Sequence, residues 1–209
     1  MTIAIIGAGQ VGSALGRNLV ARGEHVRFGV PDPDKYASLA RELGGRAHVG
    51  TVAKAVAAAT EIVILATPYA AAAEAVRSIR DWGGRILVDA TNPIAPGLSG
   101  LSVGTSSSGA EELARLASHA RVVKAFNTTG FENMVDPEYQ QGRIFMPVCG
   151  DDADARSKIV ALVISLGFDG VDAGPLMAAR YLEPFAMTWI HLAYRQGFGR
   201  KFAFSIIRR

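Results

Sequence analysis

Short apolar runs alternate with amphipathic segments along most of this chain. Residues 2–6 are apolar and rich in β-branched side chains, and glycines follow, which predicts a buried strand. Residues 11–22 repeat their apolar side chains at the spacing of one helix face, and Gly23 ends that helix. Residues 25–30 predict a second strand. The chain therefore opens with a β-α-β unit.

The same alternation continues for four more strands. Runs such as 62–65 and 86–88 are apolar throughout, which is typical of strands covered on both faces. Right-handed crossovers between them give an α/β fold with a doubly wound, parallel Rossmann sheet. The further predicted strands are 47–49, 61–66, 85–89 and 121–126, with helices that begin near Asp34, from 52, and over 70–79 and 110–118.

Residues 144–209 predict a small C-terminal α/β extension. Its strands are expected over 144–149 and 168–172, with a helix over 153–166 and a long helix from about 176. Four side chains on that last helix are spaced three to four residues apart and so share one face. We interpret this stripe as part of the core, although such a stripe can also face a ligand cleft. The four side chains are Glu183, Met187, His191 and Tyr194.

Composition and charge exclude several classes of protein. The chain has 209 residues, a formal net charge of +3 and a single cysteine, Cys149, so a disulfide scaffold is impossible and a cytoplasmic location is expected. The small charge excess does not indicate nucleic-acid binding. The N-terminus lacks a basic region typical of a signal peptide, and the apolar stretch 185–194 is too short to span a bilayer. We therefore expect no membrane partner.

A glycine-rich turn between the first strand and the first helix carries the strongest chemical signal. It consists of Gly7, Ala8, Gly9, Gln10, Val11 and Gly12. The first glycine allows a tight turn, the second lets the backbone approach a pyrophosphate, and the third lets the helix pack close to the strand. Free N–H groups and the helix dipole then face the phosphates. The motif in this context predicts a dinucleotide-binding site.

The end of the second strand bears on the choice of dinucleotide. An NAD site usually has an acidic residue there, but this chain has Val30 followed by Pro31, and Asp32 comes two residues too late. Lys35 lies one helical turn further and can reach a 2′-phosphate. We therefore favour NADP over NAD and leave NAD possible.

Neutral polar residues and prolines follow three later strands. Because ligands bind outside the carboxyl ends of an open α/β sheet, these residues are candidates to hold a nicotinamide and its ribose. No nucleophile–base pattern and no metal-ligand cluster occurs, so we predict no metal site, while hydride transfer needs neither. Lys124 is expected to be an ion-pair partner and Cys149 a buried filler. The candidates are Ala66, Thr67, Pro68, Asn92, Pro93, Ala125, Phe126 and Asn127.

Four segments together carry a resemblance to a known family: 5–9, 122–127, 147–152 and 172–176. With them the chain resembles the deazaflavin (coenzyme F420) dependent NADP oxidoreductases and their bacterial relatives, and the resemblance covers nearly the whole chain. It implies a Rossmann domain over 1–143, and an extension over 144–209 that contributes to an acceptor site and to homodimer contacts. It also implies hydride transfer between NADPH and a flat redox partner.

The resemblance also bears on single positions. The family's Ser-Arg pair for the 2′-phosphate is Val30-Pro31 here, whereas its downstream lysine is matched by Lys35. Deazaflavin-using members commonly have a His and an Ile at the positions where this chain has Asn127 and Thr129. These two residues and His191 are our candidates for the acceptor pocket, and we expect the acceptor to be a flavin or deazaflavin-like small molecule.

Two other interpretations stay open. One is a non-catalytic dinucleotide sensor, because acid–base residues are lacking. The other is a small-molecule dehydrogenase of the β-hydroxyacid type, although only a short stretch follows Pro175 in place of that family's large helical domain.

Overall fold

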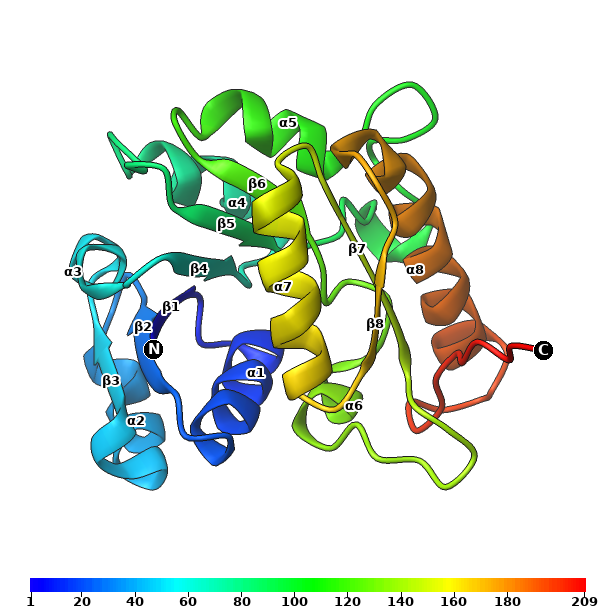
Figure 1. Cartoon of the computed structure of the whole chain (residues 1–209), viewed down its shortest axis with the longest axis horizontal. Coiled ribbons are helices and arrows are strands. Elements are labelled where there is room, and N and C mark those ends of the chain that lie inside the picture. Colours follow the sequence, from blue (N-terminus) through cyan, green and yellow to red (C-terminus); the bar gives the residue numbers. More distant parts are fainter.

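Eight strands form one sheet in the protein, which we describe from a computed structural model covering residues 1–209 (Figure 1). The strand order is β3-β2-β1-β4-β5-β6-β7-β8. Strands β1 to β6 are parallel, which confirms the predicted doubly wound α/β fold. Their bounds are β1 Thr2–Ile6, β2 His25–Gly29, β3 Ala47–Gly50, β4 Ile62–Leu65, β5 Ile86–Asp89 and β6 Arg121–Lys124.

Helices cover both faces of the sheet because the inner strands carry apolar side chains on both sides. Ile3 and Ile5 of β1 pack on the side of α1 (Gln10–Ala21), α2 (Ala37–Leu43), α6 (Phe131–Val135) and α7 (Ala153–Ser165). Ala4 and Ile6 pack on the side of α3 (Val52–Ala58), α4 (Tyr69–Arg77) and α5 (Gly109–Leu116). Because successive side chains of β1 point to opposite faces of the sheet, the strand contributes to two separate hydrophobic cores.

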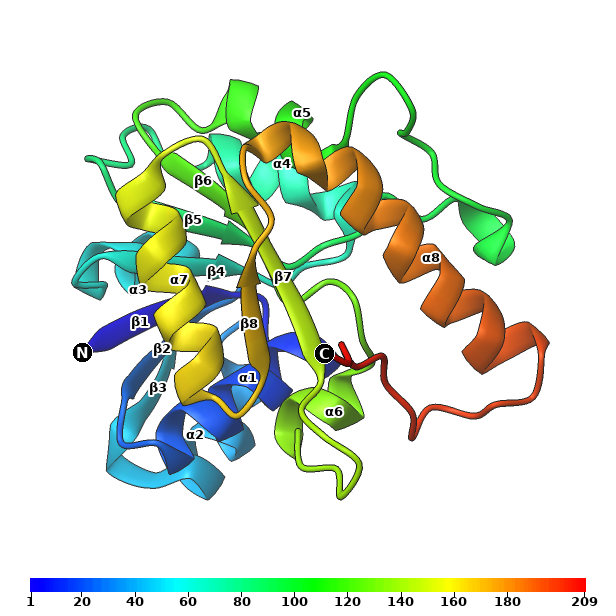
Figure 2. The ribbon, with the colours of Figure 1, turned by 45° about the vertical axis from the view of Figure 1, so that its right-hand side comes forward.

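The C-terminal residues extend the same sheet. Strand β7 (Phe145–Gly150) pairs antiparallel with the end of β6, and β8 (Asp169–Asp172) pairs parallel with β7 after the α7 crossover. The long helix α8 (Ala179–Arg195) follows β8 and runs down the side of the molecule opposite the N-terminus (Figure 2). Its Leu182 carbonyl accepts a hydrogen bond from Asn127, in the turn that follows β6. The extension therefore supplies a wall at the carboxyl edge of the sheet.

The expected core stripe on α8 is wrong. Glu183 is buried and Met187 is partly buried, but His191 and Tyr194 are exposed. The face that α8 buries instead carries Leu182, Ala186, Trp189, Ile190 and Ala193. The stripe that we chose follows a polar edge of the helix, because four residues at helical spacing do not show which side meets the protein.

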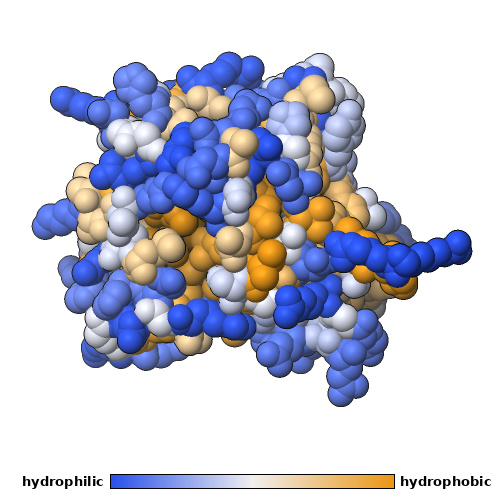
Figure 3. All heavy atoms as spheres, in the orientation of Figure 1, coloured by the Kyte–Doolittle hydropathy of each residue, from blue (hydrophilic) through white to orange (hydrophobic).

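No helix in the structure is both long enough and apolar enough to cross a membrane. On the face of the molecule seen in Figure 3, hydrophobic atoms reach the surface near the centre and are surrounded by hydrophilic ones. Residues 196–209 contain no helix or strand and run back past α8 to the start of β7, where the Phe145 N–H donates to the Phe204 carbonyl.

Candidate functional site

The sheet order brings the predicted nucleotide-binding segments to one edge. Strands β1, β4, β5 and β6 are neighbours and parallel, so the segments that follow them emerge side by side. These segments are 7–12, 66–68, 92–93 and 125–127. The sequence placed them at strand ends, and the topology makes the four ends adjacent.

The glycine turn has the geometry that a pyrophosphate needs. Gly7 has a φ of +100°, and a Cβ there would lie 2.7 Å from the Ala66 carbonyl oxygen. A Cβ on Gly12 would lie 2.1 Å from the Gly7 carbonyl oxygen. A Cβ on Gly9, by contrast, would meet nothing within 4 Å, and the first turn of α1 has no acidic residue. The turn therefore leaves open space at a helix N-terminus that favours anions.

A cavity of about 410 Å³ opens beside this turn. Gly7, Val30 and Thr67 are the predicted residues that line it. The rest of its lining comes from the ends of β1 and β2, from residues 51–53 at the start of α3, and from one face of α4. The position, between the phosphate turn and the end of the second strand, is where the adenosine half of a dinucleotide lies in this fold.

Lys35 does not line the cavity. It lies in a short 3-10 helix, Asp34–Tyr36, is exposed, and makes no ion pair, and its Nζ lies 5.8 Å from the centroid of the Tyr36 ring. Val30, by contrast, is buried. The only ionisable side chain in the lining is Glu74 of α4.

Two asparagine amides join the ends of β5 and β6. The Asn92 Nδ2 donates to the Asn127 carbonyl at 2.9 Å, and the Asn127 Nδ2 donates to Asn92 Oδ1 at 3.0 Å and to the Leu182 carbonyl at 3.2 Å. These partners fix the orientation of the Asn127 amide, because in the reversed orientation its oxygen, rather than its NH2 group, would face the two acceptors. Phe126, just before it, has a φ of +61°, a conformation that non-glycine residues seldom adopt outside functional sites or turns.

Buried polar atoms without partners lie in the same region. The Asn127 Oδ1 and the Thr67 Oγ1 are both enclosed and make no hydrogen bond. An unsatisfied buried polar group costs about 1–3 kcal/mol, so each of these two atoms is a candidate to meet a ligand or a water.

The three acceptor-pocket candidates do not lie together. Asn127 belongs to the amide pair, and Thr129 is buried with its hydroxyl accepting from Asn133 of α6 at 2.7 Å. His191 is exposed on α8 and lines a separate cavity of about 580 Å³ with residues 98–101 and Thr188. Neither Asn127 nor Thr129 lines that cavity.

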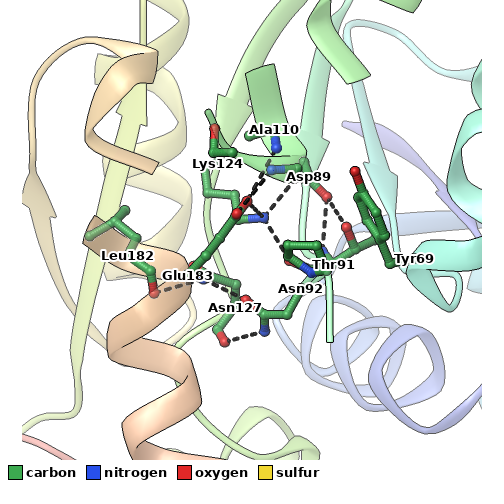
Figure 4. Close-up of polar contacts among 12 residues, drawn as sticks. Tyr69, Asp89, Thr91, Asn92, Ala110, Lys124, Asn127, Leu182 and Glu183 are labelled. Carbon is green, nitrogen blue, oxygen red and sulfur yellow. Dashed lines mark hydrogen bonds and ion pairs between the residues drawn. The ribbon is translucent and has the colours of Figure 1, made fainter. Parts of the chain in front are cut away.

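A buried ionic network supports the edge from behind (Figure 4). The Lys124 Nζ donates to Asp89 Oδ2 and Glu183 Oε1, both at 2.8 Å, and to the Thr91 carbonyl at 2.6 Å. Glu183 also accepts from the backbone N–H groups of Gly109 and Ala110 at the start of α5. The expectation that Lys124 is an ion-pair partner is confirmed. The network connects β5, β6, α5 and α8, and Thr91 directly precedes Asn92.

Burial and charge set the proton affinities around this network. Burial alone lowers the pKa of Lys124, but the negative charges of Asp89 and Glu183 outweigh it, and the pKa is raised above its ordinary value. Burial raises the pKa of the Cys149 thiol to about 12, and Cys149 is fully buried as expected. Burial, together with the hydrogen bond that Tyr69 donates to Glu112, raises the pKa of the Tyr69 phenol. None of these groups serves as an acid or base near neutral pH.

Sequence reasoning missed Glu74, Ser78 and the partners of Glu183. Glu74 and Ser78 lie on an alanine-rich helix whose pattern indicates only packing. Glu183 was noted for its helical spacing, but a burial of 99% for a carboxylate has no signal in a single sequence, because its partners come from segments 59 and 73–74 residues away.

Comparisons with known proteins agree with this geometry. Residues 2–93, which contain the glycine turn and the end of β5, match the model of a family described as NADP oxidoreductase, coenzyme F420-dependent. A structure from Arthrobacter sp. FB24, described as a candidate F420-dependent NADP reductase, is 31% identical, with coverage of 99% of each chain and a TM-score of 0.84. A hypothetical protein from Sinorhizobium meliloti is 33% identical, with coverage of 88% of this chain and 90% of that one and a TM-score of 0.80.

A curated relative is the rat metalloreductase STEAP3. It is 30% identical over 183 residues, which cover 87% of this chain and 35% of the relative. The chain thus spans about a third of the length of the metalloreductases that it matches.

Proposed function

The chain belongs to the family of coenzyme F420-dependent NADP oxidoreductases, and we propose that it transfers hydride between NADP(H) and a flavin or deazaflavin-like acceptor. In this proposal the dinucleotide lies along the carboxyl edge of the sheet, from the cavity beside β2 to the ends of β5 and β6. NADPH, when bound, supplies the hydride, and the protein binds and orients it.

The open space at Gly9 is the observation that carries this proposal. A side chain is sterically possible there, yet the position is bare and lies at the N-terminus of a 12-residue helix with no acidic first turn. An adjoining cavity fits the adenosine half by its place in the fold. The residues present therefore fit a dinucleotide.

We assign the nicotinamide half to the ends of β4, β5 and β6. The amides of Asn92 and Asn127 fix each other and cannot gain or lose protons, so they orient a ligand without exchanging protons with it. The unpartnered amide oxygen of Asn127 complements the N–H donors of a carboxamide.

The test combines binding with turnover. We expect NADPH to bind saturably, as measured by calorimetry, and its absorbance to fall only when an acceptor is added. The acceptor panel is riboflavin, FMN, FAD and F420. Tight NADPH binding with no turnover in the whole panel would contradict hydride transfer to this class and favour the sensor interpretation. Failure of NADPH and NADH to bind at all would contradict the assigned site.

A further inference from the structure

The cavity beside the glycine turn has one wall made by a single face of α4. Ala71, Glu74 and Ala75 of α4, and Ser78 directly after its last residue, line it at the spacing i, i+3, i+4 and i+7. The short side chains of the two alanines leave space beside this helix face. The lining from the end of β2 and the start of α3 consists of small or aliphatic residues and one threonine. Such a space suits a flat ring.

The polar groups on this wall are all acceptors. No hydrogen bond or ion pair of the structure engages the carboxylate of Glu74, which is exposed at the cavity. The Ser78 hydroxyl donates its proton to the Ala75 carbonyl at 2.7 Å, which leaves its oxygen only lone pairs to offer. A ligand group that meets this wall must therefore bring N–H or O–H donors.

We propose that Glu74 and Ser78 recognise the exocyclic amino group of adenine, an inference that rests on the proposed function. The adenosine half of NADP(H) has three kinds of group: phosphates, a ribose and adenine. The phosphates are anionic and would be repelled by a carboxylate, and the free ribose hydroxyl lies next to the 2′-phosphate and shares that repulsion. The amino group of adenine carries two N–H donors on the edge of a flat ring, away from the phosphates. Glu74 thus fixes which end of the ligand occupies this part of the cavity, and which base is accepted.

Replacing the adenine by hypoxanthine tests this directly. Hypoxanthine carries an exocyclic carbonyl oxygen at C6 in place of the amine, so the Glu74 carboxylate would meet an acceptor at that atom, and the proton on N1 lies one ring position away. We expect the wild-type protein to bind NADP⁺ about tenfold more tightly than nicotinamide hypoxanthine dinucleotide phosphate in calorimetry, the size expected for one partly exposed charge-assisted hydrogen bond.

The variant Glu74→Gln separates recognition from folding. Glutamine can donate to the C6 carbonyl oxygen of hypoxanthine, so the preference for adenine should fall to about twofold or less, with an unchanged melting temperature. The matched control is Glu138→Gln, an exposed glutamate outside the cavity, which should keep the tenfold preference.

The outcomes distinguish this inference from the proposed function. Equal wild-type affinity for the two dinucleotides, or an unchanged preference in Glu74→Gln, overturns base recognition by Glu74 even if NADPH is turned over. A preference that Glu74→Gln abolishes supports it even if no acceptor is reduced. If neither dinucleotide binds, the inference and the proposed function are both overturned.

Discussion

At the scale of single residues, the three glycines of the turn differ in what a side chain would meet. A Cβ on Gly12 would collide with the Gly7 carbonyl, whereas one on Gly9 would enter open space. The fold therefore requires a glycine at position 12. At position 9 the fold tolerates a side chain, so a glycine there is explained by the approach of a ligand. The sequence alone assigned roles to both, but only the geometry separates a structural glycine from a binding one.

The substitution Gly9→Val follows from this difference. We expect the variant to fold with a melting temperature close to that of the wild type, and its NADPH affinity to fall at least tenfold because the isopropyl group fills the approach of the pyrophosphate. Gly12→Ala should instead lower the melting temperature. Calorimetry and thermal denaturation of both variants measure these effects, and unchanged NADPH affinity in folded Gly9→Val would refute the assigned turn.

Lys35 is the residue that we assign to the 2′-phosphate. It has no competing ion pair, and its side chain is exposed beyond the end of β2. Lys35→Ala should weaken NADPH binding about tenfold and leave NADH nearly unaffected, because only NADPH has the extra phosphate. Lys201→Ala, another exposed lysine, is the control. An equal effect on both dinucleotides would remove Lys35 from this role.

Cys149 should be chemically silent in the folded protein. Its thiol is buried, and a pKa of about 12 leaves almost no thiolate at pH 8. We expect a thiol reagent such as DTNB to react on the timescale of global unfolding, and within seconds once guanidinium is added. Fast labelling of the native protein would show that the strand end is open.

At the scale of elements, the apolar pattern predicted the strands of the sheet within one or two residues at most ends. It did not reveal that β7 runs antiparallel, because strand direction leaves no trace in apolar spacing. It also missed α6 (Phe131–Val135), whose five residues are too few to show a helical period. The site was predictable where it depends on local motifs, and unpredictable where it depends on α8 packing against β6.

The Lys124 network is a buried polar link between α8 and the sheet, since Glu183 of α8 pairs with Lys124 of β6. Glu183→Ala leaves Lys124 paired with Asp89 but removes the acceptor of the buried Gly109 and Ala110 N–H groups, so we expect it to lower the free energy of unfolding by about 3–5 kcal/mol. Lys158→Ala, which breaks exposed pairs with Glu61 and Asp154, should cost about 1 kcal/mol or less. Chemical denaturation measures both, and similar losses would contradict a special role for the buried network.

The pH dependence of stability gives an independent check of the same network. The pKa of Lys124 is raised in the folded state above its ordinary value of 10.5. The stability that it contributes is therefore complete below about pH 10.5 and is lost as the pH rises through the folded pKa. In Lys124→Met this alkaline loss should be smaller than in the wild type. Identical alkaline slopes in denaturation curves at pH 9 to 11.5 would contradict the assignment.

At the scale of the whole molecule, the C-terminal segment closes the far side of α8. The Trp189 indole N–H and the Asn133 Nδ2 both donate to the Phe202 carbonyl, at 2.9 and 2.8 Å. The Trp189 and Phe202 rings stack with centroids 5.2 Å apart, and Phe204 packs against the same cluster. A Cβ on Gly130 would lie 2.6 Å from the Trp189 ring, so this cluster rests on the turn after β6. The C-terminal segment thus packs against α8 and, through Trp189, against the turn after β6 that forms part of the proposed site.

Truncation after Gly197 should therefore expose Trp189 while the sheet persists. We expect the tryptophan emission to shift to longer wavelength, because Trp189 is 3% exposed in the intact chain and would lose its stacking partner, and we expect the melting temperature to fall. Trp82 is fully buried and away from the tail, so the same truncation in a Trp189→Phe background should leave the emission unchanged. Removing only residues 206–209, which lie beyond the aromatic cluster, should also have no effect on the emission. An unshifted spectrum after the longer truncation would mean that residues 198–205 do not cover α8 in solution, and that the wall beside the turn after β6 stands without them.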